Sequence, residues 1–138
     1  MTHLVKLHRI ADHSGKNSFL AVSALIDRNT PINLIVDTGA THTIIDADTL
    51  QSFVPEASYN PGVTPVRGVG GKQITTQEVT IPIFQMGECP LLQYVDVLAG
   101  KGYFDDIVGV QGLLGMDILG TYSKITFDLT DNVMILEA

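Results

Sequence analysis

The tetrapeptide Asp37-Thr38-Gly39-Ala40 constrains this chain more than any other feature of its sequence. It follows the apolar run Leu34-Ile35-Val36 and precedes Thr43-Ile44-Ile45, which predicts a tight turn between two buried strands. A carboxylate at such a turn can act as a general acid or base when its surroundings tune it. The alternative is a structural aspartate that only caps its own turn. The tetrapeptide occurs once in the sequence.

The composition fits one packed globular domain. Of the 138 residues, 45% are hydrophobic and 17% are charged, which favours a buried core over disorder. The formal net charge is −7. This charge disfavours nucleic acid and anionic membranes as partners, because both require basic protein surface. We expect residues 1–138 to form a single domain.

The cysteine and histidine content gives no sign of a disulfide, metal or cofactor. Cys89 is the single cysteine, and we expect it to be a small buried hydrophobic residue. His3, His8 and His13 have no pair of carboxylates nearby, so no metal and no cofactor are expected. No apolar stretch is long enough to span a bilayer, and residues 1–10 lack the apolar core of a signal peptide. The expectation is a soluble chain, with its compartment left open.

Short alternating segments bounded by turn residues predict an all-β fold. Asp46 is expected to cap a short helix through Phe53, and a second short helix is expected over Met116–Leu119, ended by Gly120. The sum is a closed, barrel-like sheet with one or two short helices. The expected strands cover residues 4–10, 19–26, 32–36, 72–84 and 94–98, with a closing hairpin over 125–129 and 133–135.

A glycine-rich tip, Gly68-Val69-Gly70-Gly71, lies between the arms of a predicted hairpin. It does not match a phosphate-binding loop, because Gly71-Lys72 is followed by Gln73 rather than by Ser or Thr. Gln73 also takes the place of the last glycine in Gly-x-Gly-x-x-Gly. Two interpretations stay open: a simple hairpin turn, and a flap that closes over a substrate and excludes water.

Three separated segments, taken in order, resemble the retropepsin-like aspartic proteases. They are the Asp37–Ala40 turn after its apolar strand, the Gly68–Gly71 tip in the position of a flap, and Gly112-Leu113-Leu114-Gly115-Met116-Asp117-Ile118-Leu119. In this family, the third segment supports the catalytic loop and leads into a short helix. The resemblance covers about residues 19–136 and is closer to cellular and bacterial members than to viral ones. Residues 1–18 would add an extra N-terminal strand and turn.

The resemblance implies a closed β-barrel with a flap hairpin, and it implies a homodimer. Because the chain has one Asp-Thr-Gly, two copies would form one active site on a two-fold axis. The two Asp37 carboxylates would lie about 3 Å apart and share one proton, as is established for aspartic proteases, and would activate a water without a covalent intermediate. The substrate would be an extended peptide, and the chain would be an aspartic endopeptidase.

The resemblance also assigns roles to residues. Asp37 would be the acid and base, Thr38 would hydrogen-bond across the two-fold axis, and Gly39 would leave room for substrate and permit the tight turn. The residues implied to bind substrate are Ala40, Thr41, His42, Gly68, Val69, Gly70, Gly71, Leu113 and Leu114.

The sequence departs from viral members at the positions that brace their dimers. Thr41 and Met116 stand where those enzymes place an Asp and an Arg that pair, so the dimer must be braced differently and substrate preference does not carry over. Two other functions stay open. One is a catalytically silent peptide-binding or dimerisation module, and the other is a domain that matures a larger precursor and is otherwise a latent monomer.

Overall fold

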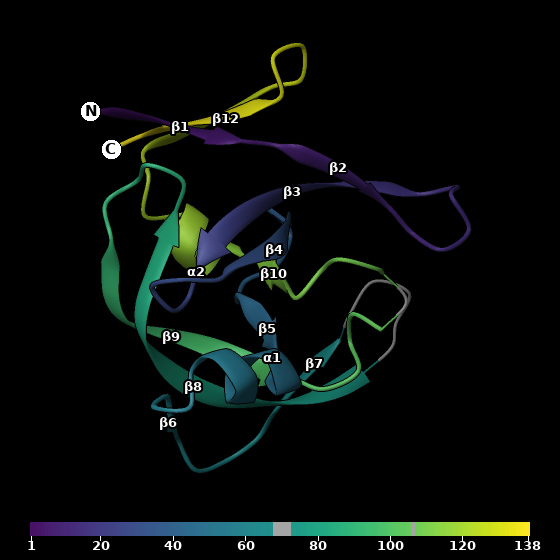
Figure 1. Cartoon of the computed structure of the whole chain (residues 1–138), viewed down its shortest axis with the longest axis vertical. Coiled ribbons are helices and arrows are strands. Elements are labelled where there is room, and N and C mark those ends of the chain that lie inside the picture. The colour runs from purple at the N-terminus through teal and green to yellow at the C-terminus, as the bar shows by residue number, and fades with distance from the viewer. Residues whose placement is uncertain (68–72, 106) are drawn as a thin grey trace.

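The computed structural model describes residues 1–67, 73–105 and 107–138, and Figure 1 shows its arrangement. The strands of this described part are β1 (Thr2–Lys6), β2 (His8–Ala11), β3 (Ser18–Leu25), β4 (Pro31–Val36), β5 (Ile44–Asp46), β6 (Ser58–Tyr59), β7 (Thr64–Arg67), β8 (Gln73–Met86), β9 (Leu92–Gly100), β10 (Gly112–Leu114), β11 (Lys124–Asp128) and β12 (Val133–Glu137). Its helices are α1 (Ala47–Phe53) and α2 (Met116–Leu119). Neither helix of the described part is long and apolar enough to cross a membrane.

Most strands belong to one sheet that curls back on itself (Figure 1). The strand order is β2-β3-β4-β10-β5-β9-β8-β6, with β7 paired to β8. β3 also pairs with β8 through Ala24 and Met86, so β3, β4, β10, β5, β9 and β8 form a ring. The predicted β class is confirmed as a mostly β fold with two short helices. Where the sequence predicted a closed barrel, the structure has this ring of strands.

The strand β10 lies between β4 and β5, and it thereby fixes the turn that joins them. Leu113 pairs in parallel with Ile35 of β4 and in antiparallel with Ile44 of β5. Gly112 makes this close approach possible, since a Cβ there would lie 2.5 Å from Leu34 Cδ2 and 2.6 Å from the Ile44 carbonyl oxygen. Any larger residue would push β10 away from one of its two neighbours.

A second, three-stranded antiparallel sheet has the order β1-β12-β11 and brings the two chain ends side by side (Figure 1). The sequence predicted one strand over residues 4–10, but the structure divides it at Leu7. The N–H of Leu7 donates to the carbonyl of Asn132 at 2.8 Å, and the Leu7 side chain is buried. As a result β1 pairs with β12 while β2 pairs with β3 in the large sheet.

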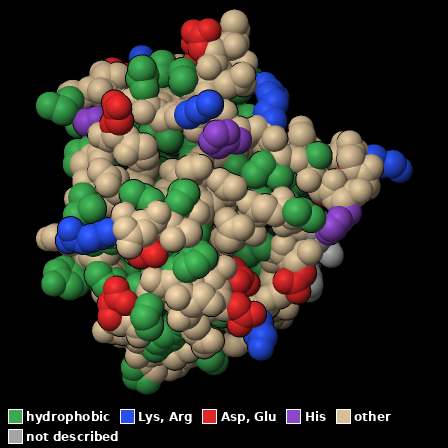
Figure 2. Space-filling view, in the orientation of Figure 1, with side chains coloured by type: hydrophobic (Ala, Val, Ile, Leu, Met, Phe, Trp, Pro, Cys, Tyr) green, Lys and Arg blue, Asp and Glu red, His purple; other side chains and the backbone are tan. Residues whose placement is uncertain are grey.

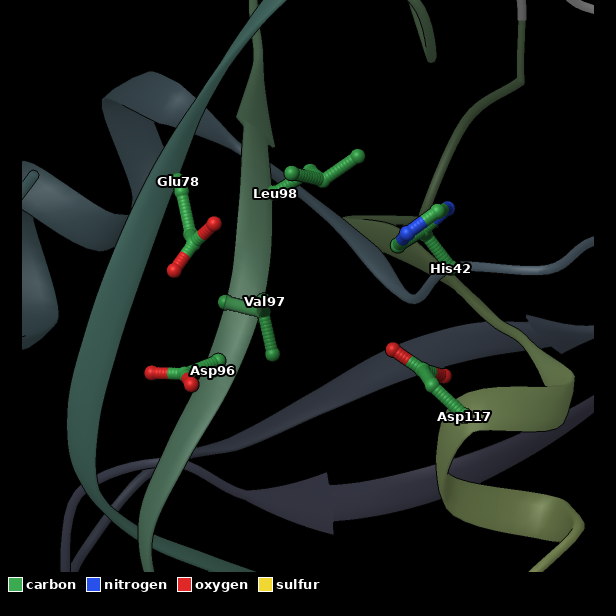
Figure 3. A pocket seen from close by; sticks show the side chains of 6 residues that line it. All are labelled: His42, Glu78, Asp96, Val97, Leu98 and Asp117. Atoms are coloured by element: carbon green, nitrogen blue, oxygen red, sulfur yellow. The ribbon is translucent and has the colours of Figure 1, made fainter. Parts of the chain in front are cut away.

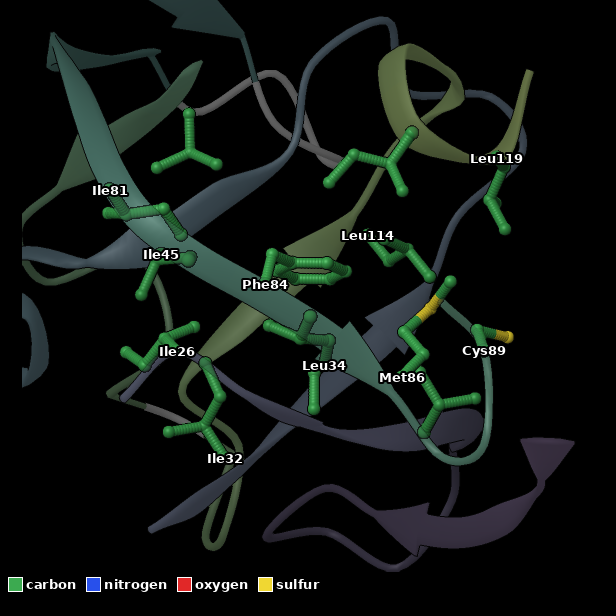
Figure 4. Close-up of a cluster of buried hydrophobic side chains, with 14 of the residues drawn as sticks. Ile26, Ile32, Leu34, Ile45, Ile81, Phe84, Met86, Cys89, Leu114 and Leu119 are labelled. Carbon is green, nitrogen blue, oxygen red and sulfur yellow. The ribbon is translucent and has the colours of Figure 1, made fainter. Parts of the chain in front are cut away.

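The main hydrophobic core is built from side chains of the ring strands together with α2 and the terminal sheet. In Figure 4, Phe84 lies at its centre, between Leu34, Ile45 and Leu114. Cys89 is buried in the same core, as predicted. Burial, and secondarily a hydrogen bond with Cys89, raises the pKa of the Tyr122 hydroxyl to about 12.

The predicted start of the first helix is confirmed. Asp46 Oδ2 accepts hydrogen bonds from the Thr49 backbone N–H and from the Thr49 hydroxyl, each 3.0 Å long. This is the arrangement expected of an N-cap carboxylate, which satisfies a donor that the helix itself cannot.

On the face shown in Figure 2, hydrophobic side chains lie in small separate patches and acidic side chains gather at the lower right.

Candidate active site

The Asp37 turn begins where β4 ends, with one backbone hydrogen bond to β10 and one within the turn. The N–H of Asp37 donates to the carbonyl of Leu114 on β10 at 3.0 Å. The N–H of Ala40 closes the turn by donating to the Asp37 carbonyl at 3.2 Å. The carboxylate of Asp37 is partly exposed, and its Oδ1 accepts from the N–H of Gly39 at 2.9 Å. This bond orients the carboxylate on the turn and leaves Oδ2 to meet another group.

Gly39 serves the site through its lack of a side chain. The sequence suggested that glycine permits the turn, but the backbone of Gly39 is not in the left-handed region that favours glycine. A Cβ at this position would instead lie 3.2 Å from Asp37 Oδ1. A larger residue would therefore crowd the carboxylate directly.

The other end of this segment is locked by Thr43, which is completely buried. Its hydroxyl donates to Asp117 Oδ1 at 2.7 Å and accepts from the N–H of Gly115 at 3.0 Å. Its backbone N–H donates to Asp117 Oδ2 at 2.9 Å, and its carbonyl accepts from the N–H of Leu98 at 2.9 Å. The side chain of Thr43 thus ties the end of the loop to Gly115 and α2, and its backbone carbonyl ties it to β9.

The segment that contains β10 and the start of α2 supports the turn along its whole length. Besides the bond from Asp37 to Leu114, the N–H of Met116 donates to the Ala40 carbonyl at 2.8 Å. Gly115 lets the two segments touch, because a Cβ there would lie 2.6 Å from the carbonyl carbon and oxygen of His42. The support that the sequence predicted for the Asp37 turn is thus a set of backbone contacts.

A small second hydrophobic cluster lies against the turn and is separate from the main core. Ala40 packs on it and is partly buried. Because this cluster contains residues of β4, β5, β9 and β10, it joins all the strands that meet at the turn. Its buried members are Ile35, Ile44, Leu98, Phe104, Val110 and Leu113.

The remaining residues expected to bind substrate lie in different settings. Thr41 and His42 are exposed next to the turn, with the Thr41 hydroxyl 2.9 Å from His42 Nδ1. The side chains of Leu113 and Leu114 are buried, and Leu114 reaches the turn through its carbonyl. The expected flap tip, Gly68, Val69, Gly70 and Gly71, lies outside the described residues.

Sequence reasoning missed Thr43 and the role of Asp117. In the sequence Thr43 only begins the apolar run of β5, and Asp117 is one acidic residue in a short helix. Their hydrogen bonds join positions 74 residues apart. A local pattern carries no signal of such a pair.

Comparison with known proteins agrees with this geometry. A family model described as aspartyl protease matches residues 22–118. The crystal structure of a retropepsin-like aspartic protease from Rickettsia conorii superposes with a TM-score of 0.62 at 18% identity, covering 99% of this chain and 98% of that one. Soybean basic 7S globulin gives a TM-score of 0.64 at 8% identity, covering 100% of this chain and 51% of the other. Among curated proteins, no sequence matches this chain significantly.

The chain belongs to the retropepsin-like aspartyl protease family. The family match includes the Asp37 turn and its β10 support. The solved structures are too distant in sequence to show more than the shared fold.

Proposed function

We propose that this chain is a homodimeric aspartic endopeptidase whose active site is formed by two Asp37 turns, one from each copy. The observation that supports this most directly is the Asp37-Thr38-Gly39 turn, held on the Leu114 carbonyl and open to solvent, in a chain of the aspartyl protease family. A single chain presents one such carboxylate. Peptide hydrolysis of this type needs two, and a second copy would supply it.

The chemistry follows from placing two carboxylates close together. Two carboxyl groups about 3 Å apart cannot both ionise without a large cost, so the pair would hold one proton. The ionised Asp37 would take a proton from a bound water while the water oxygen attacks the peptide carbonyl carbon. The protonated Asp37 would donate its proton to the carbonyl oxygen. The Asp37 that took the water proton would then pass it to the nitrogen. The C–N bond would break as the other Asp37 takes back a hydroxyl proton, which restores the shared proton with no covalent link to the enzyme.

The exposed residues of the turn have distinct parts in this proposal. Thr38 would hydrogen-bond across the two-fold axis and hold the two turns together. Ala40, Thr41 and His42 would lie along an extended peptide that binds by its backbone, as an added strand does. Ala40 is small and partly buried, which fits a backbone passing close to it.

The test compares the wild-type protein with Asp37→Asn on a diverse peptide mixture between pH 5.5 and pH 7. New peptide termini are read by mass spectrometry, and the oligomeric state of each sample is measured by sedimentation. We expect wild type to cleave and Asp37→Asn to lose about 10²–10⁴-fold in rate, since the amide cannot serve as the base. Asp131→Asn is the matched control, because it removes an exposed carboxylate from the β11–β12 turn.

Each outcome has a defined meaning. Cleavage that persists in Asp37→Asn would assign hydrolysis to another group or to a contaminant. A wild-type dimer that binds peptides but cleaves none would favour the peptide-binding module. Activity that rises with protein concentration in a mostly monomeric sample would favour a latent domain that works only when paired.

A further inference from the structure

A cavity of about 280 Å³ opens beside the end of the Asp37 segment (Figure 3). Asp37 does not line it, so the cavity is next to the catalytic turn and not part of it. In Figure 3, Glu78 and Asp96 lie on one side and His42 and Asp117 on the other. The lining consists of His42, Glu78, Asp96, Val97, Leu98 and Asp117.

His42 connects the cavity to the path proposed for the substrate. His42 is the last exposed residue of that loop, and the next residue, Thr43, is bonded to Asp117. In the proposed function the peptide runs along Ala40, Thr41 and His42, and His42 also lines the cavity. A side chain of such a peptide would therefore lie close to the mouth of the cavity.

Two carboxylates of the cavity are positioned by the pairing of β8 with β9. Thr80 pairs with Asp96 and Glu78 pairs with Leu98, so all four side chains lie on one face of the sheet. The Thr80 hydroxyl donates to Asp96 Oδ1 at 2.6 Å. The side-chain amide of Asn60 donates to Glu78 Oε1 at 2.9 Å. Both bonds come from neutral donors, so they orient the carboxylates and leave their charge unbalanced.

The charge and size of the cavity select a type of ligand. Among the residues the structure describes, neither Glu78 nor Asp96 is in an ion pair. The ion pair that the described residues do form joins Lys124 of β11 to Glu137 of β12. Within the same residues, no three acidic, histidine or cysteine side chains converge to hold a metal ion. The volume lies below the roughly 300–1,000 Å³ typical of small-molecule sites, which suits one side chain.

We propose that this cavity is a specificity pocket for a lysine or arginine side chain of the peptide substrate. Leu98 is buried at its base and can contact the alkyl stem, while Glu78 and Asp96 at its rim meet the cationic head. The side chain of Val97 lies on the opposite face of the sheet, in the main core. Asp117 adds negative charge but is already bonded to Thr43. This inference rests on the proposed peptidase function, because it is the bound peptide that brings the side chain to the cavity.

The test measures binding to Asp37→Asn, so that it does not depend on cleavage. The starting peptide is the one that Asp37→Asn retains best from the mixture. Each of its positions is replaced in turn by lysine or by norleucine, which keeps the stem and removes the charge. Dissociation constants are measured by fluorescence anisotropy at pH 7 and low salt. We expect one position at which lysine binds about fivefold tighter than norleucine.

Glu78→Gln combined with Asp96→Asn should reduce this preference below about twofold, since the amides keep the bonds from Asn60 and Thr80 but lose the charge. Asp131→Asn should leave it unchanged. A preference for lysine at no position, or one that persists in the double variant, would overturn the pocket. Wild-type cleavage of the norleucine peptide reports on the protease separately: cleavage without lysine preference rejects the pocket alone, and lysine preference without cleavage rejects the protease alone.

Discussion

The two ends of the segment from Asp37 to Thr43 differ in how many of their hydrogen-bonding groups find partners within one chain. At the first end, Thr38 and Gly39 are exposed and the Asp37 carboxylate meets only the N–H of Gly39 within the described residues. At the second end, Thr43 is 0% exposed and its hydroxyl, N–H and carbonyl are all bonded. Seven residues thus run from an open end to a sealed one.

The two ends therefore contribute differently: the sealed end fixes the conformation of the loop, and the open end presents the Asp37 carboxylate. At the sealed end, Thr43 is bonded to β9, to α2 and to Gly115 of the same chain, so a monomer can hold the loop in place. The open end is exposed, and in the proposed dimer it would meet a second carboxylate and a substrate. Substitutions at the sealed end should therefore act on folding, and those at the open end should act on assembly and catalysis.

The largest effect on stability is expected at the sealed end, from Gly115→Ala. The new Cβ would lie 2.6 Å from the carbonyl of His42, and backbone cannot yield as a side chain can. We expect a loss of about 3 kcal/mol in the free energy of unfolding, measured by urea denaturation. Gly100→Ala is the control, since its Cβ would meet side-chain methyl groups and no backbone: those of Ile44, Ile74 and Thr76, at 3.1, 3.2 and 3.6 Å. Equal losses of unfolding free energy in the two variants would show that the close contact with the His42 backbone adds no extra cost.

A smaller loss is expected from Thr43→Val, which keeps the shape of the side chain and removes its hydroxyl. The buried N–H of Gly115 would lose its acceptor, and Asp117 would lose one donor. The expected cost is about 2 kcal/mol in urea denaturation. Thr43→Ser keeps both hydrogen bonds and should lose only about 1 kcal/mol, from the missing methyl group. If serine were no better than valine, the hydrogen bonds would not be what holds this end.

The smallest effect on stability is expected at the open end, from Thr38→Ala. Because Thr38 is exposed and has no bond to its own chain among the described contacts, unfolding should change by less than about 0.5 kcal/mol. Dimer association should weaken about fivefold, the value of one lost hydrogen bond, as measured by sedimentation. Thr38→Ser should retain association. A variant that dimerises as wild type does would place the contact between the copies elsewhere.

Features that depend on neighbouring residues could be predicted from the sequence. The cap of α1 by Asp46 needs only Thr49, three positions away, and the Asp37 turn is marked by its own residues and flanking strands. The break at Leu7 could not be predicted, because it depends on the carbonyl of Asn132 at the other end of the chain. The Thr43–Asp117 pair and the Glu78–Asp96 cavity were missed for the same reason.

The position of β10 between β4 and β5 also has a consequence for how the molecule folds. The hydrogen-bond partners of Thr43 lie 72 and 74 positions further along the chain, and contacts of that separation form slowly. A chain growing on the ribosome exposes Asp37 long before residues 112–117 have been synthesised. We expect the loop to become ordered only after those residues emerge, so a nascent chain would carry its carboxylate unrestrained and inert until the fold around it is nearly complete.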